Sequence, residues 1–228
     1  EVKTTEHNMD PNTTGESYKI SVGKSILRIA SAQPSGLFRG IQTLRQLIPN
    51  QAATIKNMPV WEIPGGIIED APNYAFRGAM LDVARHFFTI QEVKRYIDLL
   101  AYYKINILHL HLTDDQGWRI EIKKYPLLTT VGAFRDSTLQ NHYTTTPRTF
   151  NKERYGGFYT QEQITEIVNY AGAKFISVVP EIEMPGHARA ALAAYPQFSC
   201  TGQAQGVEGL WGVFDDIFCA QEASIKFL

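Results

Sequence analysis

The chain has 228 residues, of which 44% are hydrophobic and 20% are charged, a balance that argues against a disordered chain. Its 22 Lys and Arg residues against 23 Asp and Glu residues give a formal net charge of -1, which argues against nucleic acid as a partner. No apolar run approaches the roughly 20 residues of a membrane-spanning helix, so we expect no membrane insertion.

The first seventy residues predict a small unit of two strands and a helix, followed by a linker. Tyr18, Ile20 and Val22 alternate with polar residues, and residues 26–30 read as a second strand after a Gly-Lys turn. Apolar residues then recur every three to four positions until Pro49, which predicts a helix. Residues 51–72 are rich in proline and glycine, so we expect a linker with short extended pieces.

The pattern from residue 76 onward alternates between strands and helices. Apolar runs at 76–83, 105–112 and 175–182 predict three buried strands. Capping-box sequences beginning at Thr89 and Thr160 predict the two helices between them. This alternation indicates a parallel sheet, either an open doubly wound sheet or a closed barrel. No glycine-rich phosphate loop follows a strand, which disfavours a nucleotide-binding open sheet.

Polar side chains follow each of the three predicted strands. They are Asp82, Arg85 and His86, then Asp114 and Asp115, and finally Glu181, Glu183 and His187. The carboxyl ends of the strands of a (β/α)8 barrel form the rim on which its active site lies. The sequence therefore predicts a functional site that combines these three groups.

Several kinds of chemistry remain open from these residues alone. Arg85 can clamp a hydroxyl-rich or anionic ligand, or be a solvated surface residue. His109, His111 and Asp114 can hold a metal, which would make the protein a barrel metallohydrolase, or the two histidines can be packed inside the barrel. His187 can orient a general acid or simply begin a helix.

At these motifs the sequence resembles family 20 glycoside hydrolases, the β-N-acetylhexosaminidases. The motifs are Arg77-Gly78, Asp82–His86, His109–Arg119, Tyr155–Thr160, Pro180–His187 and Phe214–Asp216. The resemblance covers nearly all of the chain after Gly15. It implies an α/β fold in which residues 71–228 are the first three strand–helix units of a (β/α)8 TIM barrel. Residues 1–70 would then be the end of a small α+β domain plus the linker.

The resemblance also implies an activity. Such enzymes hydrolyse terminal β-linked GlcNAc or GalNAc with retention, using the substrate's own acetamido oxygen as nucleophile. They need no cofactor and no metal, and their substrates are amino-sugar-terminated glycans or chitooligosaccharides. The location implied is exported, periplasmic or extracellular, or lysosome-like in a eukaryote, although the sequence shows no signal sequence.

The family motif carries roles over to four residues. Arg85 would bind hydroxyls of the terminal sugar. Asp114 would pair with His187, and His187 would orient the acid Glu. Glu183 would pair with Arg85 and hold its guanidinium.

One departure from the family pattern concerns the catalytic carboxylates. The family's Asp-Glu pair follows a Gly-Gly at the fourth barrel strand, and no such stretch occurs in the 228 residues. We therefore expect a fragment that lacks the C-terminal half of the barrel, leaves its third strand as a sheet edge and is inactive alone.

A silent sugar-binding module using Arg85, Asp114 and Glu183 is a further alternative. Cys200 and Cys219 either form a disulfide or are free thiols.

Overall fold

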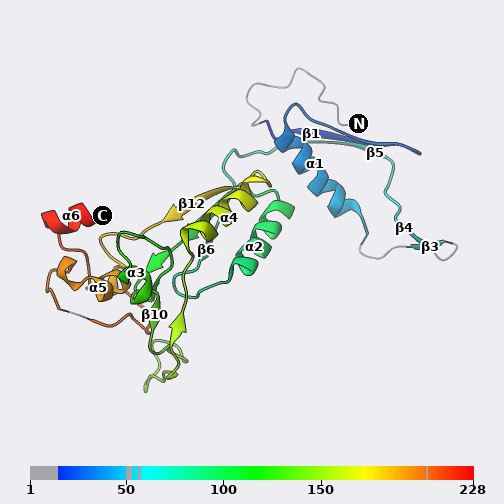
Figure 1. Cartoon of the computed structure of the whole chain (residues 1–228). Coiled ribbons are helices and arrows are strands. Elements are labelled where there is room, and N and C mark those ends of the chain that lie inside the picture. The colour runs from blue at the N-terminus through cyan, green and yellow to red at the C-terminus, as the bar shows by residue number, and fades with distance from the viewer. Residues whose placement is uncertain (1–14, 50–52, 56–57, 204) are drawn as a thin grey trace. The chain divides into compact units, whose positions relative to one another are not determined.

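The computed structural model describes residues 15–49, 53–55, 58–203 and 205–228 (Figure 1). They form two compact units, each described by itself below. The first unit holds the described residues up to Gly78, together with 97–107 and 171–177. The second holds residues 79–96, 108–170 and the described part of 178–228. The domain boundary that we predict after residue 70 stays a prediction.

A three-stranded antiparallel sheet forms the centre of the first unit. Its strands are β1 (Tyr18–Val22), β2 (Leu27–Ala30) and β5 (Gly66–Asp70), in the order β2-β1-β5. Ile20 lies opposite both Ile29 and Ile68 and is fully buried. The predicted hairpin is confirmed, and the segment predicted as a linker contributes β5 as a third strand. Within the same segment β3 (Ala53–Ile55) and β4 (Met58–Val60) pair with each other.

Helix α1 (Pro34–Leu47) packs against β1 and β2, where the helical periodicity predicts it. Pro34 opens the helix, where its missing N–H has no intrahelical partner to lose. Gly40 permits the close approach of helix and sheet, because a Cβ at this position would lie 2.7 Å from the Ile29 side chain. Arg39 of α1 is buried and pairs with Glu16 at 2.8 Å.

The predicted strand–helix alternation is present after residue 76. The elements are β6 (Gly78–Asp82), α2 (Ile90–Tyr102), β7 (Ile107–His111), α4 (Gln161–Gly172) and β12 (Ser177–Glu181). The sheet order is β12-β7-β6. Backbone hydrogen bonds join Ile107 to Arg77 and Val83 to His111, so β6 and β7 run parallel.

Both capping boxes form as predicted. The Thr89 N–H donates to Glu92 Oε2 at 2.7 Å, and the Glu92 N–H donates to Thr89 Oγ1 at 3.3 Å. Thr160 and Gln163 exchange the corresponding bonds at 2.9 and 3.2 Å. Each pair satisfies backbone N–H groups that the first helical turn leaves unpaired, which fixes where α2 and α4 begin.

The rest of the second unit consists of short elements around a hydrophobic core. They are β8 (Thr113–Asp114), β9 (Gly117–Trp118), α3 (Leu127–Thr130), β10 (Phe134–Arg135), β11 (Tyr155–Gly156), α5 (Arg189–Ala194), η1 (Pro196–Phe198) and α6 (Glu222–Phe227). Trp118, Leu128 and Phe218 pack with the alanines of α5. Cys200 and Cys219 form a disulfide, with their Cα atoms 4.6 Å apart.

Strands β6 and β12 are the two edges of the three-stranded sheet, as we expect for the third strand. Met80 on β6 is 53% exposed and Val179 on β12 is 44% exposed, so apolar surface of the sheet remains uncovered among the described residues. No helix in the described part of the chain has the length and apolar character needed to cross a membrane.

Candidate functional site

The turn after β6 folds Arg85 back towards the end of its own strand. Asp82 Oδ1 accepts the backbone N–H groups of Ala84 and Arg85, each at 3.0 Å, and this Asx-type turn orders the segment. Asp82 Oδ2 then accepts a hydrogen bond from Arg85 Nη1 at 2.7 Å. The second arm of the guanidinium, Nη2, lies 2.6 Å from Asp114 Oδ2. Arg85 therefore joins the ends of β6 and β8.

Two further arginines hold the backbone around Arg85 in place. Arg135 Nη1 donates to the carbonyl oxygen of Arg85 at 2.9 Å. Arg119 is fully buried and donates to the carbonyl oxygens of Val83 and Ala84. Burial, with repulsion from Arg135, lowers the pKa of Arg119 to about 10, which leaves it charged at neutral pH. Neither arginine was among the candidate residues that we derived from the sequence.

Asp114 is the point where three basic side chains meet. Its carboxylate is fully buried, and Oδ2 lies 2.6 Å from Arg85 Nη2 and 2.8 Å from His111 Nε2. Its other oxygen, Oδ1, lies 3.1 Å from His187 Nδ1. Buried charges of this kind need partners to offset their lost hydration, and Asp114 has partners on both oxygens.

His187 is held by two adjacent carboxylates. The predicted contact with Asp114 is present, and Asp115 Oδ2 lies slightly closer, 2.9 Å from Nδ1. The hydrogen bond to Asp115 raises the pKa of His187. Burial, together with repulsion from Asp114, raises the pKa of Asp115. His187 has a φ of 46°, a left-handed conformation that is uncommon for a residue with a Cβ and that clusters at functional sites.

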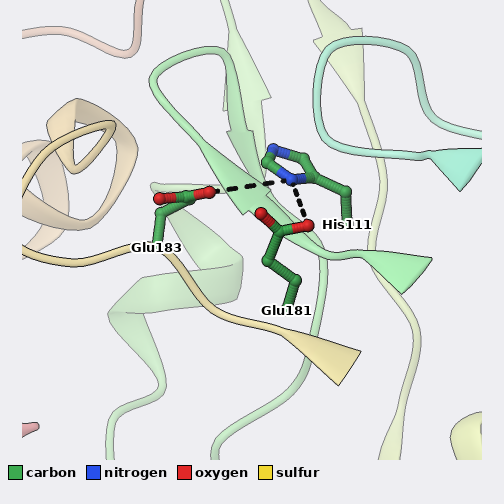
Figure 2. Close-up of side chains that lie close together, drawn as sticks. All are labelled: His111, Glu181 and Glu183. Carbon is green, nitrogen blue, oxygen red and sulfur yellow. Dashed lines mark ion pairs between the residues drawn. The ribbon is translucent and has the colours of Figure 1, made fainter. Parts of the chain in front are cut away.

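A second cluster, which we call the His111 cluster, consists of His111, Glu181 and Glu183 (Figure 2). His111 Nδ1 lies 2.8 Å from Glu181 Oε2 and 3.8 Å from Glu183 Oε1. His109 Nε2 lies 2.5 Å from the same Glu181 oxygen, so both histidines of β7 face one carboxylate, as their spacing predicts.

Protonation in the His111 cluster follows from its carboxylates. Burial alone would lower the pKa of His111, but its contacts with Asp114 and Glu181 raise it to about 9. Burial together with the neighbouring Glu181 raises the pKa of Glu183. His111 is therefore a cation at neutral pH, and its charge stabilises the carboxylates around it.

The structure corrects two expectations. Glu183 does not pair with Arg85; the ion pairs recorded for Arg85 are with Asp82 and Asp114, because the Asx-type turn already places Asp82 beside the guanidinium. The backbone N–H of Glu183 donates to Thr113 Oγ1, which holds this residue beside the His111 cluster instead.

The three residues of the metallohydrolase alternative, His109, His111 and Asp114, do not share a single point at which they could all bind one metal ion. His111 contacts Asp114 through Nε2, whereas His109 faces Glu181. His111 is buried and His109 is 40% exposed, so only one of the two is packed inside the unit.

Other candidates lie outside the site or in the core. His86 stacks against Tyr155, with ring centroids 5.2 Å apart. Trp118 is buried and donates through Nε1 to a backbone carbonyl, so it is a core residue. Trp211 lies under the guanidinium of Arg135, 5.5 Å from the ring centroid. Asp216 forms an ion pair with Arg189 at 3.4 Å.

Comparison with protein families gives two matches. Residues 74–228 match glycosyl hydrolase family 20, catalytic domain. Residues 2–71 match glycosyl hydrolase family 20, domain 2. All of the site residues described above lie within the catalytic-domain match.

Relatives and solved structures agree with these matches. A β-hexosaminidase of Porphyromonas gingivalis is 44% identical over 211 residues, which cover 92% of this chain and 26% of the relative. The GH20 β-N-acetylhexosaminidase structure from Streptomyces coelicolor has a TM-score of 0.81 at 40% identity, over 96% of this chain and 42% of that one. An exo-β-N-acetylglucosaminidase from Vibrio harveyi, solved with N-acetylglucosamine, has a TM-score of 0.78 at 37% identity, over 96% and 33%.

The chain is thus shorter than the proteins that it matches, spanning 26%, 30% and 36% of three curated relatives. Its fold is α/β, and its strand–helix alternation is that of part of a (β/α)8 barrel, in line with the neighbouring enzyme structures. The catalytic-domain match extends over residues 74–228 and includes the residues that contact Asp114. The chain therefore belongs to glycosyl hydrolase family 20.

Proposed function

We propose that the whole protein is a β-N-acetylhexosaminidase that removes terminal β-linked GlcNAc or GalNAc with retention, through the substrate's own acetamido group. The observation that carries this proposal is the unbroken series of contacts from Arg85 through Asp114 to His187. The names of the relatives, β-hexosaminidase and chitobiase among them, support amino-sugar glycans or chitooligosaccharides as substrates.

In this proposal Arg85 binds the sugar. Two carboxylates contact its guanidinium, yet the side chain is 32% exposed, so guanidinium N–H groups remain available to donate to sugar hydroxyls. Because Asp82 and Asp114 fix the guanidinium before the substrate arrives, little side-chain entropy is lost on binding.

His187 has the role of a positioning residue. Asp114 and Asp115 both contact Nδ1, which leaves Nε2 available to hold the carboxyl group of a general acid. The 228 residues contain no Gly-Gly-Asp-Glu, so we propose that another part of the protein supplies the acid and its adjacent Asp. The chain alone is then expected to be inactive.

Hydrolysis of p-nitrophenyl β-N-acetylglucosaminide tests the proposal. The full-length protein and the 228-residue chain are compared on this substrate, on the GalNAc analogue and on p-nitrophenyl β-glucoside. The glucoside has no acetamido group, so an enzyme that uses the substrate as nucleophile cannot hydrolyse it efficiently.

We expect turnover of the amino sugars by the full-length protein only, and little turnover of the glucoside by either. Equal turnover of the glucoside would refute the substrate-assisted mechanism. Turnover by the 228-residue chain would show that one of its own carboxylates acts as the acid.

We also propose that the protein is exported. The disulfide between Cys200 and Cys219 supports this, because disulfides persist mainly in oxidising compartments. Activity of the native protein in the periplasmic or extracellular fraction is the expected result, and activity confined to the cytosol would contradict the proposal.

A further inference from the structure

Arg189 is the first residue of α5 and connects this helix to a loop further along the chain. We call residues 200–219 the disulfide loop, because the disulfide described above closes it. Arg189 Nη1 lies 2.7 Å from Glu208 Oε2 and 3.4 Å from Asp216 Oδ2. Arg189 Nε donates to the carbonyl oxygen of Gly206 at 3.2 Å. One side chain therefore holds three positions of the disulfide loop beside the start of α5.

The same residue is bonded to Asp115, one of the two carboxylates that hold His187. The backbone N–H of Arg189 donates to Asp115 Oδ1 at 3.1 Å, while Asp115 Oδ2 lies 2.9 Å from His187 Nδ1. The backbone carbonyl oxygen of Asp115 accepts the N–H of Glu208 at 3.0 Å. Asp115, Arg189 and Glu208 therefore form a closed circuit of contacts, in which Asp115 is held both through its carboxylate and through its backbone.

The two carboxylates of the disulfide loop depend on Arg189 for their counter-charge. The Glu208 and Asp216 side chains are 14% and 20% exposed, and no other cation in the described part of the chain forms an ion pair with either. Glu208 Oε1 accepts two backbone N–H groups of the loop itself, so Oε2 is the oxygen that reaches Arg189. A largely buried carboxylate that loses its cation is destabilised. Loss of the guanidinium should therefore let Glu208 and its N–H group move away from Asp115.

We propose that Arg189 is a positioning residue for His187: it holds the disulfide loop against Asp115, and Asp115 in turn fixes the orientation of the imidazole. This inference rests on the proposed function, in which His187 holds the general acid. Arg189 has this role without touching the sugar, since a misplacement of about 1 Å costs on the order of 100-fold in rate. His187 also contacts Asp114, at 3.1 Å, so the loss of Arg189 should be felt only in part.

Kinetics of the full-length protein on p-nitrophenyl β-N-acetylglucosaminide tests this role. Arg189→Met removes the charge and keeps an unbranched apolar side chain, whereas Arg189→Lys keeps a cation that can pair with one carboxylate at a time. Arg154→Met is the matched control, because Arg154 is exposed and stacks on Phe134. We expect Arg189→Met to lower kcat about 10-fold with less than about a twofold change in KM. Arg189→Lys should recover part of this loss, and the control should match the parent.

A spectroscopic readout does not depend on turnover. In ¹H–¹⁵N spectra of the 228-residue chain, recorded above the pKa of His187, the ring ¹⁵N shifts show which nitrogen carries the proton. Nδ1 faces the carboxylates of Asp114 and Asp115, so we expect the proton on Nδ1 in the parent chain. Arg189→Met should raise the population of the tautomer with its proton on Nε2, whereas Arg154→Met should not. His187→Asn identifies the signals.

The outcomes separate this inference from the proposed function. If the full-length parent did not hydrolyse amino sugars, the proposed function would fail, and the His187 tautomer would still decide the role of Arg189. An unchanged tautomer in a folded Arg189→Met chain would overturn the inference, as would an unchanged kcat or a loss confined to KM in an active protein. Far-UV circular dichroism shows whether Arg189→Met is folded. If it is not, Glu208→Gln breaks the same ion pair from the loop side, and parent values of kcat and tautomer in that variant would again contradict the inference.

Discussion

Replacing Arg119 with Ala should destabilise the second unit more than any other single arginine change at the site. The guanidinium is fully buried and donates to the carbonyl oxygens of five residues, at 2.5 to 3.4 Å. The acceptors are Val83, Ala84, Gln116, Ala133 and Gly157. These carbonyls lie in four separate parts of the chain, at 83–84, 116, 133 and 157, so a single side chain holds these parts together.

The size of the effect follows from these acceptors. The carbonyls of Gln116 and Ala133 keep a second donor, Arg135 Nη1 and the Gly157 N–H respectively. A buried carbonyl that loses its hydrogen bond costs about 1 kcal/mol at the lower end of the range, which gives about 3 kcal/mol for the other three. Water that enters the space left by the side chain offsets part of this, so we expect a loss of about 2 kcal/mol in the free energy of unfolding. With a urea slope of about 2 kcal/mol per molar, the midpoint should fall by about 1 M.

Urea unfolding followed by far-UV circular dichroism measures this change. Arg119→Lys keeps the charge but offers three donors from one atom in place of the planar fork, so an intermediate midpoint is expected. Arg154→Ala is the control, because Arg154 is exposed and stacks on Phe134. If Arg119→Ala and Arg154→Ala unfolded at the same urea concentration, the carbonyl contacts would not be stabilising the unit.

Three further outcomes are expected. His187→Asn in the full-length protein should lower kcat about 100-fold with little change in KM, whereas His142→Asn should change neither; a loss confined to KM would show that His187 only binds substrate. His111 has a pKa of about 9, above its usual value near 6.5, so its stabilisation is fully present below pH 6.5 and is lost as the pH rises through 9. The parent chain should therefore lose about 3 kcal/mol more than His111→Gln between pH 6 and 10, and parallel urea midpoints would contradict this. Replacing Cys200 and Cys219 by Ser should lower the free energy of unfolding by about 3 kcal/mol, the chain-entropy value for a separation of 19 residues, and a reducing agent should then have no further effect.

Local signals in the sequence predicted most of the elements, and long-range contacts were missed. The helices α2 and α4 begin where their capping boxes predict, because both hydrogen-bond partners lie within four consecutive residues. Strand β5 was read as part of a linker, because its place in the sheet depends on pairing with β1 more than forty residues earlier.

The same distinction applies to the site. The three strand ends do bring Arg85, Asp114 and His187 together, since parallel strands present their carboxyl ends at one edge. The partner of Arg85 was predicted wrongly, although the correct one, Asp82, lies only three residues before it. Arg119 was missed for a different reason: its acceptors are backbone carbonyls, which every residue has and no sequence pattern identifies.

The single carboxylate of Asp114 couples the titration of the two histidines that it contacts. The negative charge of Asp114 stabilises the protonated form of both histidines. When His111 is protonated, its positive charge offsets part of that negative charge, so a proton on His187 is stabilised less. The protonation state of one imidazole is therefore expected to influence the pKa of the other. In a pH–rate profile of the full-length enzyme, neutralising His111 by mutation should consequently shift the midpoint assigned to His187 to higher pH, even though the two rings do not exchange a hydrogen bond with each other.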